Sequence, residues 1–226
     1  MLQLVIGNKN YSSWSMRPWV LMKQLGIAFE ERALRLDFAE GSPFRQAVAQ
    51  INPAGLVPVL VDEGLAVWDT LAIAEYLHET HPGAGVWPAG TRQRARARCL
   101  AAEMHSGFGA LRSHCPMNIE ASLPEAGARV WVEQAGVRAN VQRLEGMWAQ
   151  ALADSGGPFL FGAFGAVDAF YAPVCTRLRS YALPVSAGTA AYVERVLATP
   201  AVQAWVAGAL AEQDFLPFDE PYRQHR

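Results

Sequence analysis

Hydroxyl groups cluster near the N-terminus, in the stretch Tyr11-Ser12-Ser13-Trp14-Ser15-Met16-Arg17, between an apolar run and a helical pattern. The unpaired N–H groups of a helix start favour an anion, by about 0.3 to 1 kcal/mol at exposed sites. Because Pro18 belongs in a first helical turn, we expect regular helix from about Ser15, with Ser15 as a plain cap, or else a helix kinked at Pro18. Ser12 and Ser13 then face a ligand from the loop, although an isolated serine cluster is more often only a cap.

Two later stretches carry similar chemistry. Asn52-Pro53-Ala54-Gly55-Leu56-Val57-Pro58 places Pro58 at the entry of an apolar run, where its missing N–H does not interrupt a strand. A cis bond there would expose the backbone groups of Val57 to a bound backbone-like ligand. Trp68-Asp69-Thr70 precedes a helical pattern and offers either a second anion site or an ordinary N-cap.

The elements that must position these groups change in character along the chain. The first 80 residues read as strands near 2–6, 29–36, 59–61 and 65–67, with helices near 19–25, 42–50 and 70–79. Asp62-Glu63-Gly64 is a hairpin signal. Residues 81–90 are rich in proline and glycine and indicate a linker. Beyond them the patterns are helical, at 91–115, 124–152, 165–181, 189–197 and 200–212.

These patterns predict an α+β protein with a mixed domain at 1–80, a linker at 81–90 and an all-helical domain at 91–226. The net charge of −2 provides no strong field for a polyanion, so nucleic acid is not an expected partner. Cys99, Cys115 and Cys175 form neither a C-x-x-C motif nor a zinc spacing, which indicates a reducing compartment and no metal site. With no signal peptide pattern and no membrane-length apolar run, we expect a soluble cytoplasmic protein without a membrane partner.

Four motifs together resemble the glutathione S-transferase family over nearly the whole chain. They are S-S-x-S-x-R from Ser12, N-P-x-G-x-V-P-x-L from Asn52, D-T-L-A-I-A-E-Y-L from Asp69, and F-G-x-x-x-x-x-D ending at Asp168. The resemblance implies a thioredoxin-like β-α-β-β-β-α domain that binds glutathione, followed by a helical bundle that supplies most of a second-substrate pocket. It also implies a homodimer.

The resemblance assigns roles to individual residues. Ser12 matches the catalytic serine of the serine-type (zeta-, theta- and tau-like) classes, and Ser13 is the runner-up. Val57 would pair through its backbone with the cysteinyl part of glutathione beside cis-Pro58. Asp69 and Thr70 match the pair that takes the γ-glutamyl carboxylate. Asp168 matches a helix-capping residue, a folding element whose usual hydroxyl partner is replaced by Gly165.

The expected mechanism is activation of the glutathione thiol. A hydroxyl that donates to the sulfur favours the thiolate, and each unit by which the thiol pKa falls is worth about 1.4 kcal/mol. Ser12 is therefore expected to be a donor, and the second substrate a small hydrophobic electrophile. For its pocket we expect Trp14, His105, Phe108 and Arg112, with core packing and dimer contacts as the alternative for the last three.

Departures from the family pattern keep other functions open. Leu56 stands where many members have Lys or Gln, so one polar glutathione contact is missing or supplied from elsewhere. Trp14 replaces the cysteine of the zeta-like S-S-C pattern, which weakens the case for an isomerase of the maleylacetoacetate type. That isomerase, with Arg112 as a cationic group for a dicarboxylate, is the second hypothesis. A non-catalytic protein of the same fold is the third. The apolar segment 215–218 is expected to fold back over the bundle.

Overall fold

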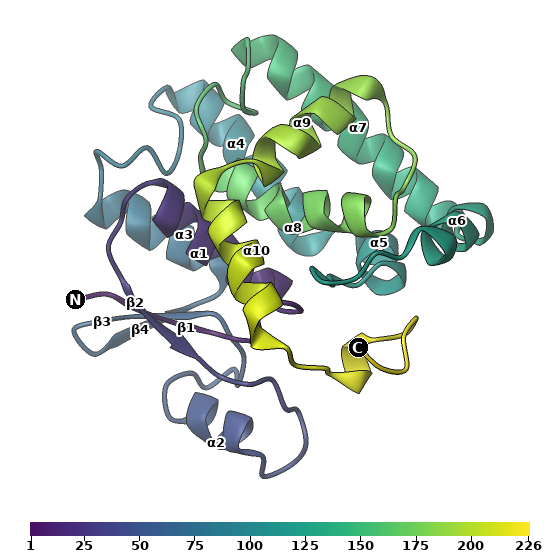
Figure 1. Cartoon of the computed structure of the whole chain (residues 1–226). Helices are drawn as coiled ribbons and strands as arrows, with labels where there is room; N and C mark the ends of the chain where they lie inside the picture. Colours follow the sequence, from purple (N-terminus) through teal and green to yellow (C-terminus); the bar gives the residue numbers. More distant parts are fainter.

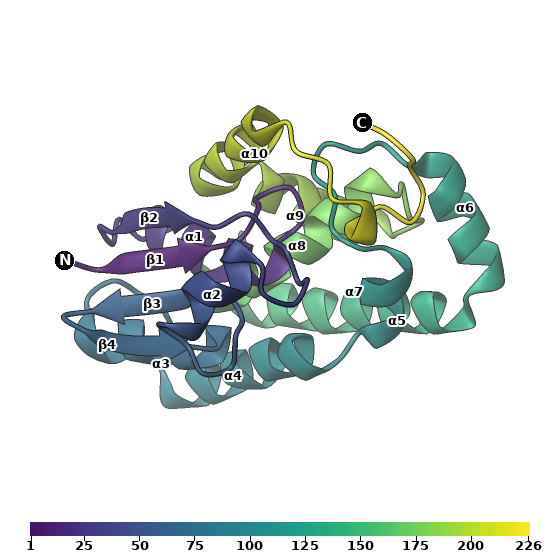
Figure 2. The same ribbon diagram turned by 90° about the horizontal axis from the view of Figure 1, so that it is seen from below.

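The computed structural model describes residues 1–226, and its N-terminal part is a four-stranded sheet in the order β2-β1-β3-β4. Strand β1 (Gln3–Ile6) runs parallel to β2 (Glu30–Ala33) and antiparallel to β3 (Val59–Asp62), which pairs with β4 (Leu65–Trp68). Helices α1 (Ser13–Gln24) and α3 (Thr70–Thr80) lie on the face toward the bundle, and α2 (Pro43–Ala49) lies on the opposite side (Figures 1 and 2). This is the predicted thioredoxin-like arrangement.

Local sequence explains most of these elements. Leu4, Val5 and Ile6 are fully buried because helices cover both faces of the sheet. The β3–β4 hairpin closes through Glu63 and Gly64, both at positive φ (47° and 90°), as a tight two-residue turn requires. The prediction of a strand at 29–36 was too long, since only Glu30–Ala33 pairs with β1.

The C-terminal part is entirely helical, as predicted. Its helices are α4 (Thr91–Ser106), α5 (Gly109–His114), α6 (Pro124–Glu133), α7 (Ala135–Ser155), α8 (Ala166–Ser180), α9 (Ala187–Leu197) and α10 (Pro200–Glu212). None of them is both long and apolar enough to cross a lipid bilayer. Between α3 and α4 the chain has no regular secondary structure.

Two helices predicted as continuous are broken. The predicted helix 91–115 is interrupted at Gly107 and Phe108, where Phe108 adopts a left-handed conformation with φ 55°. The predicted helix 124–152 is interrupted at Gln134, whose ψ of 88° is not helical. Apolar spacing alone did not reveal these breaks, because buried residues continue on both sides of each one.

Helix α8 is the centre of the molecule. Nearly all of its residues are buried, and one continuous hydrophobic core joins it to α1 and the sheet. Asp168 near its start accepts hydrogen bonds from Leu160 N (3.1 Å), Gly165 N (3.1 Å) and Tyr192 Oη (2.8 Å). Burial raises the pKa of this carboxyl to about 6. Asp168 thus ties the bundle together around α8.

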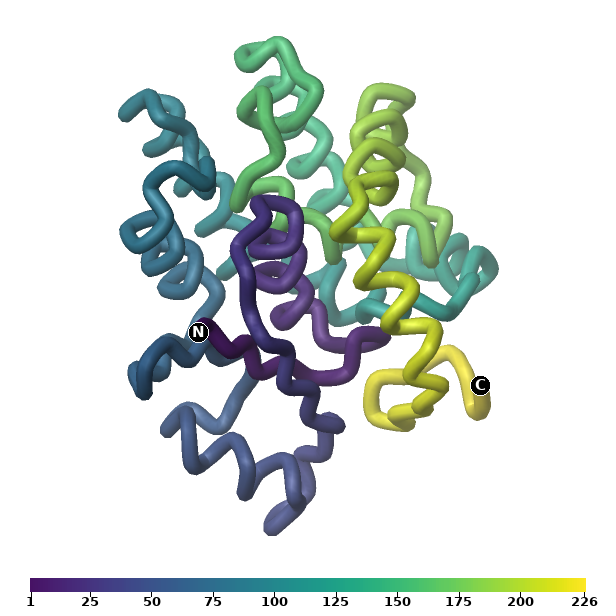
Figure 3. Tube along the Cα trace, turned by 60° about the vertical axis from the view of Figure 1, so that its left-hand side comes forward, coloured from purple at the N-terminus to yellow at the C-terminus, as the bar shows by residue number.

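The C-terminal segment leaves α10 and returns to the N-terminal part, ending in a short 3-10 helix η1 (Pro217–Asp219) and a final loop (Figures 1 and 3). Leu216 is 1% exposed and packs with Tyr11, Leu36 and Phe44. The prediction that this segment covers the bundle was therefore incomplete: its apolar contact is to the thioredoxin-like part, while Tyr222 Oη donates to His114 O of the bundle (2.7 Å).

Candidate active site

A cavity of about 920 Å³ lies between the two parts of the molecule. From the N-terminal part it is lined by residues that the sequence had singled out: Ser12, Ser13, Trp14, Val57, Pro58, Asp69 and Thr70. From the helical part and the C-terminal segment it is lined among others by Arg112, Met117, Arg177 and Asp219. The three predicted motifs therefore meet in one cleft.

Ser12 occupies the N-cap position of α1, but its side chain accepts no hydrogen bond from the first turn. Its hydroxyl is instead hydrogen-bonded to that of Ser15 (Oγ to Oγ, 2.7 Å), and Ser15 Oγ accepts from Gly7 N (3.1 Å). Ser15 is fully buried. A chain of hydrogen bonds thus leads from the end of β1 to the edge of the cleft.

The expected helix start at Ser15 was wrong, because α1 begins at Ser13. Hydrogen bonds from Ser12 N to Asn8 O (2.7 Å) and from Met16 N to Ser12 O (3.1 Å) turn the chain into the helix earlier. Pro18 then lies inside the helix, where its missing N–H costs one helical hydrogen bond. Ser15 is consequently a buried partner of Ser12 and not a plain cap.

The other predicted groups are distant from these serines in the sequence but line the same cleft. The peptide bond between Val57 and Pro58 is cis, and both residues line the cavity. Asp69 caps α3 by accepting from Leu71 N (2.8 Å), with a φ of 74°. Thr70, the first residue of α3, is buried, and its Oγ1 accepts from Arg17 Nη1 at 3.5 Å.

His105 stands behind the cleft and contacts its lining. Its Nε2 lies 3.2 Å from Asp69 Oδ2, and its ring meets that of Trp14 edge-on with 5.0 Å between centroids. Burial lowers the pKa of His105, while the neighbouring Asp69 opposes that shift. His105 therefore orients Asp69 and Trp14 from outside the cavity.

Phe108 does not line the cleft. It is 6% exposed and belongs to the hydrophobic core, at the break between α4 and α5. This position fits the core-packing alternative, and contact of Phe108 with the second substrate stays a prediction. Arg112, predicted beside it, does line the cleft, and its guanidinium carbon lies 4.9 Å from the centre of the Trp14 ring.

Sequence reasoning missed three charged residues around the cleft. Arg17 stacks on Trp14 at 4.1 Å and is 1% exposed, and burial lowers its pKa to about 9. Arg177 on α8 is also buried, which lowers its pKa to about 10. Asp219 comes from η1. Two of these residues had a sequence signal: Arg17 belongs to the S-S-x-S-x-R motif, and Arg177 is a charged residue within an apolar helical pattern. The sequence carries no comparable signal for Asp219.

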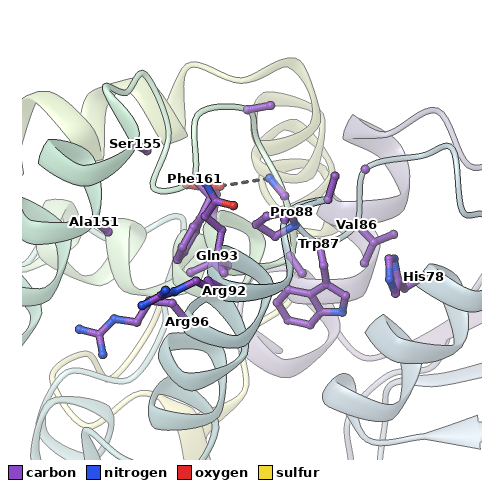
Figure 4. A pocket seen from close by; sticks show the side chains of 18 of the residues that line it. His78, Val86, Trp87, Pro88, Arg92, Gln93, Arg96, Ala151, Ser155 and Phe161 are labelled. Carbon is purple, nitrogen blue, oxygen red and sulfur yellow. Dashed lines mark hydrogen bonds between the residues drawn. The ribbon is translucent and has the colours of Figure 1, made fainter.

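A second cavity of about 800 Å³ lies over the segment between α3 and α4 (Figure 4). Its lining includes Trp87 and Pro88 from that segment, Arg92 and Arg96 from α4, and Ser155 from the end of α7. None of the predicted site residues lines it. The candidate active site is therefore the cleft at Ser12.

Comparisons with known proteins agree with this fold. Residues 11–80 match the family model "Glutathione S-transferase, N-terminal domain", and residues 120–208 match "Glutathione S-transferase, C-terminal domain". Dichloromethane dehalogenase of Methylorubrum extorquens is 40% identical over 78 residues, which is 33% of this chain and 26% of that protein. A probable maleylacetoacetate isomerase of Vibrio cholerae is 30% identical over 104 residues, 46% of this chain and 48% of that protein.

These matches span between a quarter and a half of the curated relatives' length. Solved structures match more completely. A glutathione transferase homolog from Burkholderia with bound glutathione has a TM-score of 0.70 at 25% identity, covering 93% of this chain and 98% of that one. A glutathione transferase from Methylococcus capsulatus has a TM-score of 0.66 at 25% identity, covering 93% and 100%. Because the two family models together cover more than half of its residues, the chain belongs to the glutathione S-transferase family.

Proposed function

We propose that this protein is a glutathione transferase, in which Ser12 activates the thiol of glutathione for attack on a small electrophile. The observation that carries the proposal is the meeting of Ser12, the Val57–Pro58 segment and the N-terminus of α3 in one cleft. Solved relatives that share the fold include one with bound glutathione. Each of the three groups suits a different part of that tripeptide.

The thiol lies at Ser12 in this proposal. A free thiol has a pKa near 8.5 and is mostly protonated at pH 7, whereas the thiolate is the nucleophile. Rotation of the Ser12 hydroxyl toward sulfur stabilises the thiolate, and the Ser15 hydroxyl, 2.7 Å away, can then donate to Ser12 Oγ. Gly7 N already donates to Ser15 Oγ, so the three donors polarise one another toward the sulfur.

The rest of glutathione is held by backbone groups, one hydroxyl and one carboxylate. Val57 offers its amide and carbonyl to the cysteinyl part where β3 begins. The first-turn N–H groups of α3 and the Thr70 hydroxyl receive the γ-glutamyl carboxylate, with buried Arg17 behind that hydroxyl. Asp69, kept in place by Leu71 N and His105, faces the γ-glutamyl amino group.

A second candidate is glutathione-dependent isomerisation of a dicarboxylate. Several partly matching relatives, including those of Vibrio cholerae and Rattus norvegicus, are named maleylacetoacetate isomerases. The observation that favours it here is the pair Arg112 and Arg177, two guanidiniums that line the cleft without a carboxylate within 4.0 Å. Cationic groups of this kind suit an anionic substrate.

A homodimer and a cytoplasmic location remain predictions. The edge strand β4 exposes Leu65 and Trp68 (53% and 42%), an apolar surface that a second copy could cover. Light scattering of the purified protein measures the oligomeric state directly, and a monomer at micromolar concentration would contradict the dimer.

The proposed function is tested by calorimetric titration with glutathione, followed by activity assays on halides, epoxides, peroxides and maleylacetoacetate-type dicarboxylates. We expect saturable binding and turnover of at least one class. Binding without any turnover, or no binding at all, would favour the third hypothesis, a non-catalytic protein of this fold.

A further inference from the structure

The cleft has more buried positive charge than its lining neutralises. Arg112 and Arg177 line the cavity, Arg17 stacks on the lining residue Trp14, and none of the three forms a salt bridge. Burial lowers the pKa of Arg17 and of Arg177, and repulsion from the neighbouring arginines lowers it further. Because buried charges in proteins are normally paired, this excess indicates an anion that the protein chain does not fully supply.

Arg177 keeps part of its guanidinium available. Its Nε donates to Cys115 O (2.9 Å) and its Nη1 to Pro173 O (3.0 Å), and these two bonds fix the group at the cleft wall. Its Nη2 has no hydrogen-bond partner in the protein and is accessible to solvent. A fixed guanidinium with one unpaired nitrogen at a cavity is suited to binding a carboxylate.

Asp219 is the acidic side chain that faces this group from the C-terminal segment. It lines the same cavity, and its carboxylate accepts no hydrogen bond from the protein. Its place is imposed by its neighbours: Glu220 accepts from Tyr11 Oη (2.7 Å) and from Asn118 Nδ2 (2.8 Å), and Leu216 is buried. These contacts hold the segment to both parts of the molecule, so Asp219 is held at the cleft.

We propose that Asp219 is a specificity-determining residue of the second-substrate pocket, an internal carboxylate that competes with an anionic group of the substrate for Arg112 and Arg177. This inference rests on the proposed function, because it concerns the same cleft. When Asp219 is ionised it offsets part of the arginine charge and disfavours a second anion. When it is protonated, the arginines are left to the substrate and the acid can donate a hydrogen bond to it.

The charges around Asp219 set the direction of the pH dependence. Burial and the neighbouring Glu220 raise its pKa to about 6, while Arg177 on α8 opposes them. Arg112 on α5 faces the same cavity, and Glu220 is itself held by Arg223. A ligand carboxylate brings a further negative charge and raises the pKa of Asp219 again, so binding takes up a proton. Affinity for the anion therefore increases as the pH falls from 8 toward 5.5.

The test uses two probes that differ in one group, S-benzylglutathione with a para-carboxylate and the same molecule with a para-carboxamide. Dissociation constants of both probes are measured by calorimetry at pH 5.5 and 8. At each pH, the ratio of the two probes' constants gives the preference for the carboxylate and removes effects of pH that are common to both probes. In the wild-type protein we expect the preference for the carboxylate to be about tenfold greater at pH 5.5 than at pH 8. This corresponds to a rise of roughly one unit in the pKa of Asp219 when the carboxylate probe binds. In Asp219→Asn the preference should be high at both pH values.

Asp154→Asn is the matched control, since it removes one carboxylate from the exposed end of α7, outside the cleft. The preference of this variant for the carboxylate probe should depend on pH as it does in the wild type. Arg112→Gln should lower the preference for the carboxylate at both pH values. Equal melting temperatures would show that Asp219→Asn leaves the fold intact.

An unchanged pH dependence in Asp219→Asn, or equal affinity for the two probes in the wild type, would overturn the inference while leaving the proposed function standing. Failure of both probes to bind would overturn both. Binding of the carboxamide probe alone would support the proposed function and reject the arginine subsite.

Discussion

The two walls of the cleft are built in different ways. On the thioredoxin-like side, the groups that face the cavity stand at the ends of elements: Ser12 before α1, Pro58 before β3, and Thr70 at the start of α3. On the helical side, Arg112 and Arg177 project from α5 and α8, and Asp219 comes from a segment a hundred residues further along than α5. The first wall depends on local geometry, and the second on long-range packing.

Helix α8 provides the largest expected effect, because the second wall needs it in place. Asp168→Ala leaves the N–H groups of Leu160 and Gly165 and the hydroxyl of Tyr192 without their acceptor. A buried unpaired polar group costs about 1 to 3 kcal/mol, so we expect a loss of about 3 kcal/mol in the free energy of unfolding. Urea denaturation measures this loss. Asp154→Ala, at an exposed carboxylate on α7, should change it by less than about 0.5 kcal/mol.

Ser12→Ala tests the first wall. Loss of a hydrogen bond to a charged group costs about 1.5 to 3 kcal/mol, so we expect kcat/KM at pH 6.5 to fall by about 10- to 100-fold. Because the defect is in thiol ionisation, activity should recover as the pH approaches the pKa of free glutathione, while glutathione affinity changes little. A full pH–rate profile measures both.

Ser13→Ala is the control for that variant, since Ser13 also lines the cleft and is equally buried. If Ser13→Ala shows the pH-dependent defect and Ser12→Ala does not, the activating hydroxyl belongs to Ser13. A loss in Ser12→Ala that is the same at every pH would contradict thiol activation.

Thr70→Val should separate binding from activation within the same wall. The substitution keeps the shape of the side chain and the N-terminal N–H groups of α3 but removes the hydroxyl beside Arg17. We expect the dissociation constant of glutathione to rise about tenfold with kcat nearly unchanged. Thr80→Val, at the exposed C-terminal end of the same helix, should leave the constant unchanged. A fall in kcat alone would reject a role for Thr70 in binding.

The difference between the walls also explains what could be predicted from the sequence. Strand and helix order and the Glu63–Gly64 turn follow from short-range patterns in the first 80 residues. The resemblance to the glutathione S-transferase family implied that Ser12, Pro58 and Thr70 meet in one site, and all three line the cleft. The helix start at Ser13 was missed because hydrogen bonds from the Asn8 loop outweighed the proline rule. Phe108, in a left-handed conformation, breaks an apparently continuous helix and packs in the core, as the core-packing alternative predicts. Arg177 and Asp219 meet only through the packing of α8 against the returning C-terminal segment.

Leu56 is a position where the first wall departs from its family pattern, and it offers the smallest test. Its side chain is 57% exposed and lines the cleft, while its carbonyl is fixed by Asn52 Nδ2 at 2.7 Å. Replacing this side chain therefore leaves the backbone before Val57 undisturbed. Leu56→Lys adds a cation to a wall whose glutathione-binding groups are hydroxyls, backbone groups and the Asp69 carboxylate, and glutathione carries two carboxylates.

Because exposed ion pairs contribute about 0.2 to 1 kcal/mol, we expect Leu56→Lys to tighten glutathione binding by about threefold at low salt and by less at high salt. Calorimetry at two ionic strengths measures both effects. Leu210→Lys, at a similarly exposed leucine on α10 outside the cleft, adds the same charge and should leave affinity unchanged. Equal gains in both variants would mean that net charge alone attracts glutathione, and no gain in Leu56→Lys would mean that the cleft compensates for Leu56 through other groups.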